Sequence, residues 1–149
     1  MKQNSGFTLI EILIAVVIVA ILASVAVPAY IEQVAKAKRA DAQGALLGLA
    51  QSMERFFTEN NTYCGSDADG VVGTCVDGDV PGIFATQVPT DGGDPYYNLT
   101  ITTTTATNYT LTATRTGSMA RDANCGDYTL NSVGQMNHTG GNARDYCVK

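Results

Sequence analysis

The feature that most constrains this chain is an uninterrupted apolar segment near its beginning. Residues 12–31, ILIAVVIVAILASVAVPAYI, are twenty residues without a charged side chain. At about 1.5 Å of rise per residue, a helix of this length spans the roughly 30 Å hydrocarbon core of a bilayer. Because backbone polar groups cannot stay unsatisfied in lipid, we expect the segment to be helical throughout, with a bend only at Pro28.

A conventional secretory signal is the competing interpretation of this segment, because Ser24 and Ala26 form a small-x-small cleavage pattern. That interpretation predicts a soluble binding or enzymatic domain that begins near Val27 after cleavage. Two features favour a retained helix instead. Lys2 is the only positive side chain ahead of the segment, and the helical pattern continues past the place where a signal would be removed.

The helical periodicity continues well beyond the apolar segment. Apolar or small residues recur at spacings of three and four, which places them on one helical face: Ile31, Val34, Ala35, Ala42, Ala45, Leu46, Leu49, Met53 and Phe56. Lys36, Gln43 and Glu54 fall on the opposite side. The pattern predicts one helix over residues 7–58, on the order of 78 Å long. We expect residues 7–31 to need apolar surroundings on all sides, and residues 32–62 to pack on a globular domain.

Glu11 stands at the inner edge of this apolar segment. A carboxylate costs roughly 2.5 to 3.5 kcal/mol at the middle of a bilayer and less near an interface, so such a group usually has a partner. Lys2 is nine residues away, too far for an adjacent helical turn. Cleavage between Gly6 and Phe7 would create a free amine four residues before Glu11. The alternative is an interfacial glutamate that faces the lipid headgroups and has no partner.

The junction at Gly6 carries a family resemblance. The run KQNSG followed by FTLIE resembles the class III signal of type IV pilins, and the continuation through Pro28 and the long helix is similar to the same family. The resemblance implies that residues 1–6 are a leader, that a prepilin peptidase cleaves after Gly6, and that the new amine of Phe7 is methylated. It also implies assembly into a helical filament, in which Glu11 pairs with the Phe7 amine of an adjacent subunit.

Two features depart from the family pattern. Many relatives carry glycine where this chain has Ala20, so local unwinding there is less favoured, since alanine stabilises a helix by about 1 kcal/mol over glycine. In addition, three basic residues, Lys36, Lys38 and Arg39, follow the apolar segment, which a positive-inside count would read as a cytoplasmic C-terminus. The leader and the cysteines favour the opposite orientation, with the C-terminal domain periplasmic before assembly and extracellular in the pilus.

Residues 63–149 carry the turn and strand signals of a globular head. Residues 63–95 are rich in glycine, proline and aspartate, which predicts a long connecting loop. After it come segments that alternate or extend a sheet: residues 97–102, 109–114, 128–130 and 135–136. We expect the first two to form a hairpin whose apolar side chains pack on the helix: Leu99, Ile101, Tyr109 and Leu111. The predicted fold is α+β, one long helix against a three- or four-stranded antiparallel sheet, as the type IV pilin resemblance also implies.

The four cysteines all lie in this head, and an even number favours disulfides formed in an oxidising compartment. Four cysteines allow three pairings, and the sequence alone does not choose among them. We expect nearest neighbours to pair, Cys64 with Cys75 and Cys125 with Cys147, because the second loop resembles the C-terminal disulfide region of the pilins. Each cross-link would contribute about 3 kcal/mol in the chain-entropy model.

The sequence predicts no catalytic, cofactor or metal site. It contains no nucleophile motif, phosphate loop or pair of catalytic carboxylates, so we expect no enzymatic activity. Zinc is disfavoured because there is no CxxC pair and His138 stands alone among polar loop residues. Asp67, Asp69 and Gly70 resemble a fragment of a calcium loop, but the twelve-residue pattern is absent and a solvated acidic turn explains them as well.

The formal net charge of −5 disfavours nucleic acid as a partner. Nonspecific affinity for nucleic acid comes mainly from lysine and arginine side chains that displace counterions. A DNA-binding version of this chain would need a basic stripe drawn from its few cations: Lys36, Lys38, Arg39, Arg115, Arg121 and Arg144.

The leading functional hypothesis is a type IV pilus subunit, major or minor, that is stored in the inner membrane and assembled into extracellular filaments. The resemblance implies adhesion, twitching motility or DNA uptake, with other pilins, the prepilin peptidase, the pilus assembly machinery and membrane lipid as partners. Segments around residues 53–63 and 124–135 look most like those of minor pilins. The alternatives are a pseudopilin of a type II secretion system, which shares the signal and helix, and the soluble domain released by conventional signal cleavage.

Overall fold

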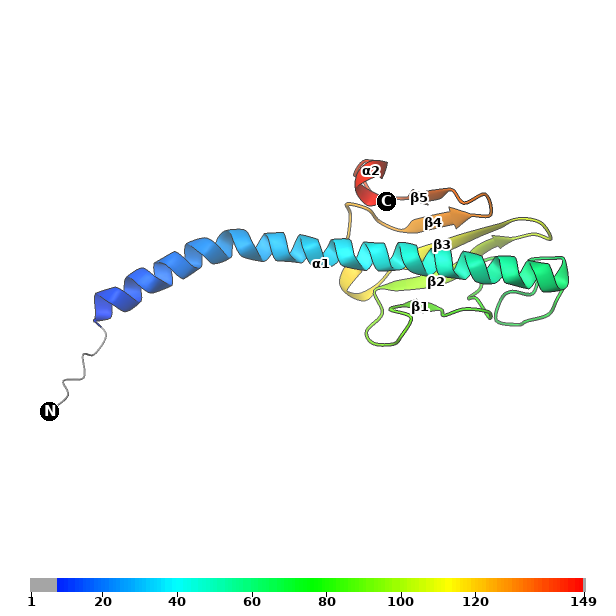
Figure 1. Cartoon of the computed structure of the whole chain (residues 1–149), viewed down its shortest axis with the longest axis horizontal. Helices are drawn as coiled ribbons and strands as arrows, with labels where there is room; N and C mark the ends of the chain where they lie inside the picture. The colour runs from blue at the N-terminus through cyan, green and yellow to red at the C-terminus, as the bar shows by residue number, and fades with distance from the viewer. Residues whose placement is uncertain (1–7, 149) are drawn as a thin grey trace. The chain divides into compact units, whose positions relative to one another are not determined.

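The structure, a computed structural model, describes residues 8–148. Its main elements are the 52-residue helix α1 (Leu9–Asn60) and a five-stranded antiparallel sheet (Figure 1). The chain divides into two compact units, the first ending at Lys36 and the second formed by Ala37–Lys149.

Helix α1 has a defined beginning and end. The backbone N–H of Glu11 donates to the Thr8 hydroxyl at 3.3 Å, an arrangement in which a threonine before the first turn satisfies one of its free donors. The helix continues through Pro28 without interruption. After its last residue, Asn61 adopts a positive φ of 56°, and its N–H donates to the Phe57 carbonyl at 2.8 Å. Asparagine tolerates this left-handed conformation, so it ends the helix as a glycine often does.

The strands of the second unit follow one another in space in the order of the sequence, each antiparallel to the next. The longest pair, β2 with β3, is the hairpin that the alternating sequence predicted. Two short helices, η1 and α2, flank β4 and β5 in the chain. The bounds are β1 (Gln87–Val88), β2 (Tyr97–Thr104), β3 (Tyr109–Arg115), η1 (Gly117–Met119), β4 (Tyr128–Asn131), β5 (Met136–His138) and α2 (Arg144–Cys147).

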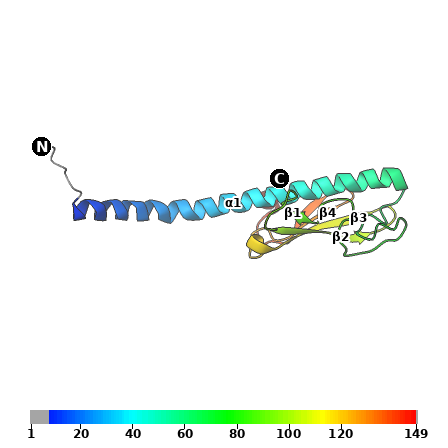
Figure 2. The ribbon, with the colours of Figure 1, turned by 90° about the horizontal axis from the view of Figure 1, so that it is seen from below.

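The core lies between one face of the sheet and the second half of α1, which runs along that face (Figure 2). Alternate strand residues point into it because successive side chains of a strand face opposite ways. The sheet contributes Val88, Tyr97, Leu99, Ile101, Tyr109, Leu111, Ala113, Tyr128, Leu130 and Met136, and the helix contributes Ala42, Ala45, Leu46, Leu49 and Met53. These include the four hairpin residues that the sequence predicted to pack on the helix.

The segment between α1 and β2 is more ordered than the predicted long loop. Its first part is closed by the Cys64–Cys75 disulfide, and its middle follows the sheet edge, where Asp79 forms an antiparallel bridge with Ile101. It then contributes β1, whose two residues pair with the start of β2. A two-residue strand is too short to show an alternating pattern in the sequence. The structure therefore has five strands where three or four were predicted.

The predicted fold class is confirmed: a long helix packed on an antiparallel sheet. The helix ends at Asn60, two residues later than predicted, because Glu59 and Asn60 complete the last turn before Asn61 caps it. Its predicted start at Phe7 lies outside the described residues.

Candidate functional site

The first unit presents an apolar half-helix, residues 9–31 of α1. Its large aliphatic side chains are exposed throughout, from Leu9 at 85% to Ile31 at 61%. An 18-residue window of this helix has a mean hydropathy of 3.0, and none of it is buried. The helix is therefore long and apolar enough to cross a membrane. Water is a poor environment for so large an apolar surface, so this segment needs lipid or other apolar helices around it.

Glu11 lies in the first turn of this apolar half-helix and is exposed. Within residues 8–148, the Glu11 carboxylate makes no hydrogen bond or ion pair. The hydrogen bond to the Thr8 hydroxyl comes from the backbone N–H of Glu11, not from its side chain. Gly6 and Phe7, the residues expected to flank the cleavage site and to supply the new amine, lie outside the described residues. Their pairing with Glu11 stays a prediction. Ala20 and Pro28 both lie inside the continuous helix.

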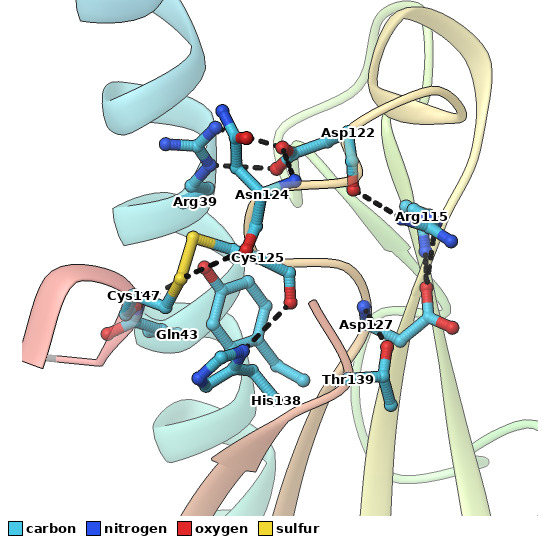
Figure 3. Close-up of polar contacts among 11 residues, drawn as sticks. Arg39, Gln43, Arg115, Asp122, Asn124, Cys125, Asp127, His138, Thr139 and Cys147 are labelled. Atoms are coloured by element: carbon cyan, nitrogen blue, oxygen red, sulfur yellow. Dashed lines mark hydrogen bonds and ion pairs between the residues drawn. A yellow bond between two sulfur atoms is a disulfide. The ribbon is translucent and has the colours of Figure 1, made fainter. Parts of the chain in front are cut away.

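A second arrangement fastens the C-terminal segment to the other half of α1. Cys125, just before β4, is joined to Cys147 at the end of α2. The Cys147 carbonyl accepts two hydrogen bonds, from Gln43 Nε2 at 2.6 Å and from the Tyr128 hydroxyl at 3.2 Å (Figure 3). Gln43 is therefore buried, and its predicted place on the polar side of the helix is wrong. The amide lies at the border of the apolar stripe, where it shares the Cys147 carbonyl with the Tyr128 hydroxyl.

An ion pair lies beside this disulfide. Arg39 of α1 donates from Nε and Nη2 to the two carboxylate oxygens of Asp122 at 2.8 and 2.9 Å (Figure 3), and the two side chains are only 5% and 6% exposed. Burial acts to raise the pKa of Asp122, but the hydrogen bonds and charge of Arg39 outweigh it, so that pKa is lowered. We call these four residues, Arg39, Asp122, Cys125 and Cys147, the C-terminal clamp.

A second arginine extends the clamp to the sheet. Arg115 Nε lies 3.6 Å from Asp127 Oδ1, and its Nη1 donates to the Asp122 carbonyl. Asp122 therefore holds one arginine with its carboxylate and another with its backbone. Of the six cations from which a DNA-binding stripe would have to be drawn, two are already engaged within the protein: Arg39 is buried and Arg115 is committed to this network. Sequence could not show this, because Arg39 and Asp122 are 83 residues apart.

Three other cations lie next to clamp residues in the sequence or in the same short helix. Lys38 precedes Arg39, Arg121 precedes Asp122, and Arg144 begins α2. Arg121 and Arg144 are exposed. Lys38 donates to the Ser118 hydroxyl at 2.7 Å and lies over the Tyr96 ring, 5.2 Å from its centroid. We call Lys38, Arg121 and Arg144 the cation group.

An open cleft of about 590 Å³ adjoins Lys38 and Tyr96. Its remaining wall comes from the turns at residues 94–95 and 116–118, including the acidic Asp94. The Tyr96 hydroxyl donates to Asp41. Burial first, and then the hydrogen bond to Asp41, raise the pKa of Tyr96 to about 12. The hydroxyl is thus a neutral donor at physiological pH, and the cleft combines one cation, Lys38, with one carboxylate, Asp94.

A packing contact between Gly48 and Phe84 was not anticipated from the sequence. A Cβ placed on Gly48 would lie 3.0 Å from Phe84 Cζ, so the glycine gives the ring room against α1. The sequence did offer one sign of this contact. Glycine in the middle of a helix lowers its stability, so its presence there indicates a packing requirement.

Among residues 8–148, no three histidine, cysteine or acidic side chains are grouped so that they could hold a metal ion. His138 directs Nδ1 at the Cys125 carbonyl, 3.2 Å away.

Two family models match successive parts of the chain. The family described as type IV minor pilin ComP, DNA uptake sequence receptor, matches residues 28–129, about two thirds of the chain. The prokaryotic N-terminal methylation motif matches residues 1–27. The structure is also similar to the minor pilin PilV of Neisseria meningitidis, with a TM-score of 0.52 and 20% identity over 74% of this chain and 92% of PilV. At that identity the likeness concerns the fold alone.

Curated relatives match part of the chain. The type IV major pilin protein PilA of Myxococcus xanthus is 41% identical over 61 residues, which are 41% of this chain and 28% of PilA. The type II secretion system core protein G of Pseudomonas aeruginosa is 39% identical over 42% of this chain and 44% of that protein. The type IV major fimbrial protein FimA of Dichelobacter nodosus is 37% identical over 59% of this chain and 53% of FimA. The chain thus spans about half or less of the length of these three relatives.

Proposed function

The chain belongs to the type IV pilin family, and from that premise we propose that it is a minor subunit of the pilus that waits in the inner membrane until assembly. One observation carries the proposal. The apolar half-helix is fully exposed over a membrane-spanning length, while the second half of the same helix is already packed on the sheet. The exposed half of such a helix can be covered by lipid before assembly and by other pilin helices afterwards.

Processing would complete the N-terminus. Cleavage after Gly6 leaves the Phe7 amine four residues before Glu11. Since the Glu11 carboxylate has no ion pair within residues 8–148, a methylated amine from a neighbouring subunit would supply the missing positive charge. In an apolar filament core this pairing is worth more than in water, because the effective dielectric constant is lower. Pro28 lies in the same apolar half-helix, where it would locally bend the helix for packing in the filament.

The N-terminus of the isolated protein tests this proposal against conventional secretion. Mass spectrometry of the purified chain should find a methylated Phe7 at the N-terminus. A mature chain that starts at Val27 would refute retention of the apolar half-helix and support a released soluble domain.

Filament recovery tests assembly and separates the pilin from a pseudopilin. Sheared surface filaments should contain the wild-type chain, and a Glu11→Ala variant should insert in the membrane but be depleted from filaments. Glu32→Ala, which changes an acidic residue beyond the apolar half-helix, serves as the control. A wild-type chain found only in the envelope fraction would favour a type II secretion role, and normal incorporation of Glu11→Ala would contradict the pairing.

The match to the ComP description favours a finer role, capture of DNA during uptake. The cation group supplies the side chains that this role would use, because Arg39 and Arg115 are committed to the clamp. Three phosphate contacts predict a salt dependence with a slope of about −2.7 on a double-logarithmic plot of affinity against salt. Such a small number of contacts is compatible with a chain of net charge −5.

Salt-dependent gel shifts with double-stranded DNA test this finer role. Changing Lys38, Arg121 and Arg144 together to glutamine should remove most of the slope, while Arg55→Gln, an exposed cation elsewhere on α1, should leave it unchanged. The role is refuted if the wild-type chain binds no DNA, or if the triple variant keeps the affinity and slope of the wild type. Neither result would affect the filament assay, which reports on the apolar half-helix.

A further inference from the structure

The open cleft beside Lys38 holds two opposite charges that are not paired with each other or with other charged groups. Lys38 Nζ donates to the neutral Ser118 hydroxyl at 2.7 Å, and an ammonium has three N–H donors, so two of them stay available. Within residues 8–148, the exposed Asp94 carboxylate makes no hydrogen bond or ion pair. Lys38 and Asp94 line the same cleft of about 590 Å³, a volume typical of small-ligand sites. The cleft therefore offers one cation and one anion to a ligand.

The walls of this cleft are fixed by contacts within the head. The Thr116 N–H donates to the Tyr96 carbonyl at 3.0 Å, which ties the two lining turns together. A Cβ on Gly117 would lie 2.4 Å from the Pro95 carbonyl oxygen, so only glycine permits this close approach. On the helix side, the residue after Lys38 belongs to the C-terminal clamp. A preformed cleft loses little conformational freedom when a ligand enters, which favours binding.

The cleft lies close to the apolar half-helix along the chain. Lys38 is seven residues after Ile31, and both belong to α1, so at most about 10 Å of helix separates their backbones. The headgroup layer extends roughly 5–8 Å beyond the hydrocarbon core on each side, and a lysine side chain can bend its ammonium toward that layer. If the apolar half-helix lies in lipid, Lys38 is therefore within reach of phospholipid headgroups.

The charges of the cleft distinguish between classes of ligand. A purely anionic ligand would be attracted by Lys38 but repelled by Asp94. It would also meet Asp41, whose carboxylate accepts the hydroxyl of the cleft residue Tyr96. A purely cationic ligand would be repelled by Lys38. A zwitterion, with a negative and a positive group a few bonds apart, can pair with Lys38 and Asp94 at once.

We propose that the cleft binds the headgroup of a phosphatidylethanolamine molecule while the subunit waits in the membrane. Lys38 and the Ser118 hydroxyl donate to phosphate oxygens, and Asp94 accepts a hydrogen bond from the primary ammonium. This inference rests on the proposed storage in the inner membrane and adds one specific lipid to it. When the subunit enters the filament, the cleft leaves the bilayer and Lys38 is released for the DNA contact proposed above.

Lipid retention by the full-length chain measures the headgroup preference. The chain is purified in an uncharged maltoside detergent and given equal amounts of phosphatidylethanolamine, phosphatidylglycerol and phosphatidylcholine with identical acyl chains. Native mass spectrometry then counts the bound lipid of each kind. Phosphatidylethanolamine should exceed the anionic phosphatidylglycerol about fivefold, the factor that one exposed charge pair supplies. Phosphatidylcholine should lie between them, because its methylated ammonium has no N–H to donate to Asp94.

Variants of Asp94 separate headgroup recognition from general attraction of lipid. Asp94→Asn should abolish the preference for phosphatidylethanolamine over phosphatidylglycerol, and Asp94→Lys should reverse it, because the cleft then holds two cations. Asp69→Lys makes the same change of net charge at an exposed aspartate of the connecting segment and should keep the wild-type preference. A thermal melt of each variant in the same detergent checks that it is folded.

A wild-type preference that Asp94→Asn removes and Asp94→Lys reverses, with Asp69→Lys unchanged, supports the proposal. It is overturned if the wild type does not prefer phosphatidylethanolamine, if Asp94→Asn keeps the preference, or if Asp69→Lys shifts it as much as Asp94→Lys does. Soluble glycerophosphoethanolamine that binds as well as the lipid would exclude the lipid as the source of the headgroup.

Flotation with lipid vesicles separates this inference from the proposed function. A chain that floats with vesicles of any headgroup but shows no preference in the mass spectra refutes only the lipid site. A chain that fails to float with vesicles would contradict storage in the membrane itself.

Discussion

Replacing Asp122 by asparagine would leave the buried Arg39 guanidinium without its negative partner. Arg39 is 4% exposed and forms two parallel bonds to the carboxylate at 2.8 and 2.9 Å, so water cannot easily replace the lost charge. Breaking one side of a buried pair typically costs about 3–5 kcal/mol. We expect a loss in the free energy of unfolding of that size.

The loss converts into a large shift of the melting temperature. For a unit of roughly this length, 1 kcal/mol moves Tm by about 4 °C, so Asp122→Asn should lower it by about 12–20 °C. Thermal unfolding of the full-length chain in detergent, followed by near-ultraviolet circular dichroism, measures this shift. The tyrosines of the core make that signal specific for packing of the second unit.

Two further variants make the reasoning refutable. Asp69→Asn changes an exposed aspartate in the connecting segment and should alter stability by no more than about 0.5 kcal/mol. Replacing both partners, Arg39→Met with Asp122→Leu, removes the stranded charge and should regain part of the stability. A Tm for Asp122→Asn within 3 °C of the Asp69→Asn value, or a double variant less stable than Asp122→Asn, would show that burial of the pair does not control stability as argued.

The other predictions concern pH, the disulfide and a buried tyrosine. Because the folded-state pKa of Asp122 is lowered, its stabilisation is present above its unfolded pKa of about 3.9 and is lost as pH falls through the lower folded value; acid denaturation of Asp122→Asn should lack this component, and identical acid limbs would contradict it. Cys125→Ser with Cys147→Ser should lose about 3 kcal/mol in urea unfolding, and an unchanged midpoint would oppose a stabilising cross-link. Burial first, and then the hydrogen bond that the Tyr63 hydroxyl donates to the Glu54 carboxylate, raise the pKa of Tyr63 to about 12. Glu54→Gln should therefore lower that pKa in a titration followed at the tyrosinate absorbance, without returning it fully to the usual value; no change would exclude the Glu54 contribution.

The elements with a strong period could be predicted from the sequence. The apolar segment, the amphipathic stripe through Leu46 and Leu49, and the alternating hairpin at Leu99 and Ile101 all follow from local spacing, which burial then enforces. Resemblance to the pilin signal added the processing site and the role of Glu11, which spacing alone left open. The fold class could therefore be assigned before the structure was known.

The parts that could not be predicted depend on contacts between distant residues. Arg39 was grouped with the other cations because its residue type does not show that it is buried, and its partner Asp122 lies far along the chain. Gln43 was placed on the polar side because a single amide at the stripe border gives no local sign of the Cys147 carbonyl that it bonds. Strand β1 is only two residues long, so its pairing with Tyr97 and Asn98 leaves no periodic trace.

The polar bonds at Arg39 and Gln43 also set where the head can sit along the helix. The stripe formed by Ala42, Leu46 and Leu49 is smooth enough that a slide of one turn, about 5.4 Å, would still cover apolar surface. Such a slide would break the bidentate pair with Asp122 and the bond to the Cys147 carbonyl together. Together with the fit of Phe84 against Gly48, the clamp therefore fixes a single register between the sheet and residues 37–60 of α1, so that every copy of the subunit is assembled from the same register.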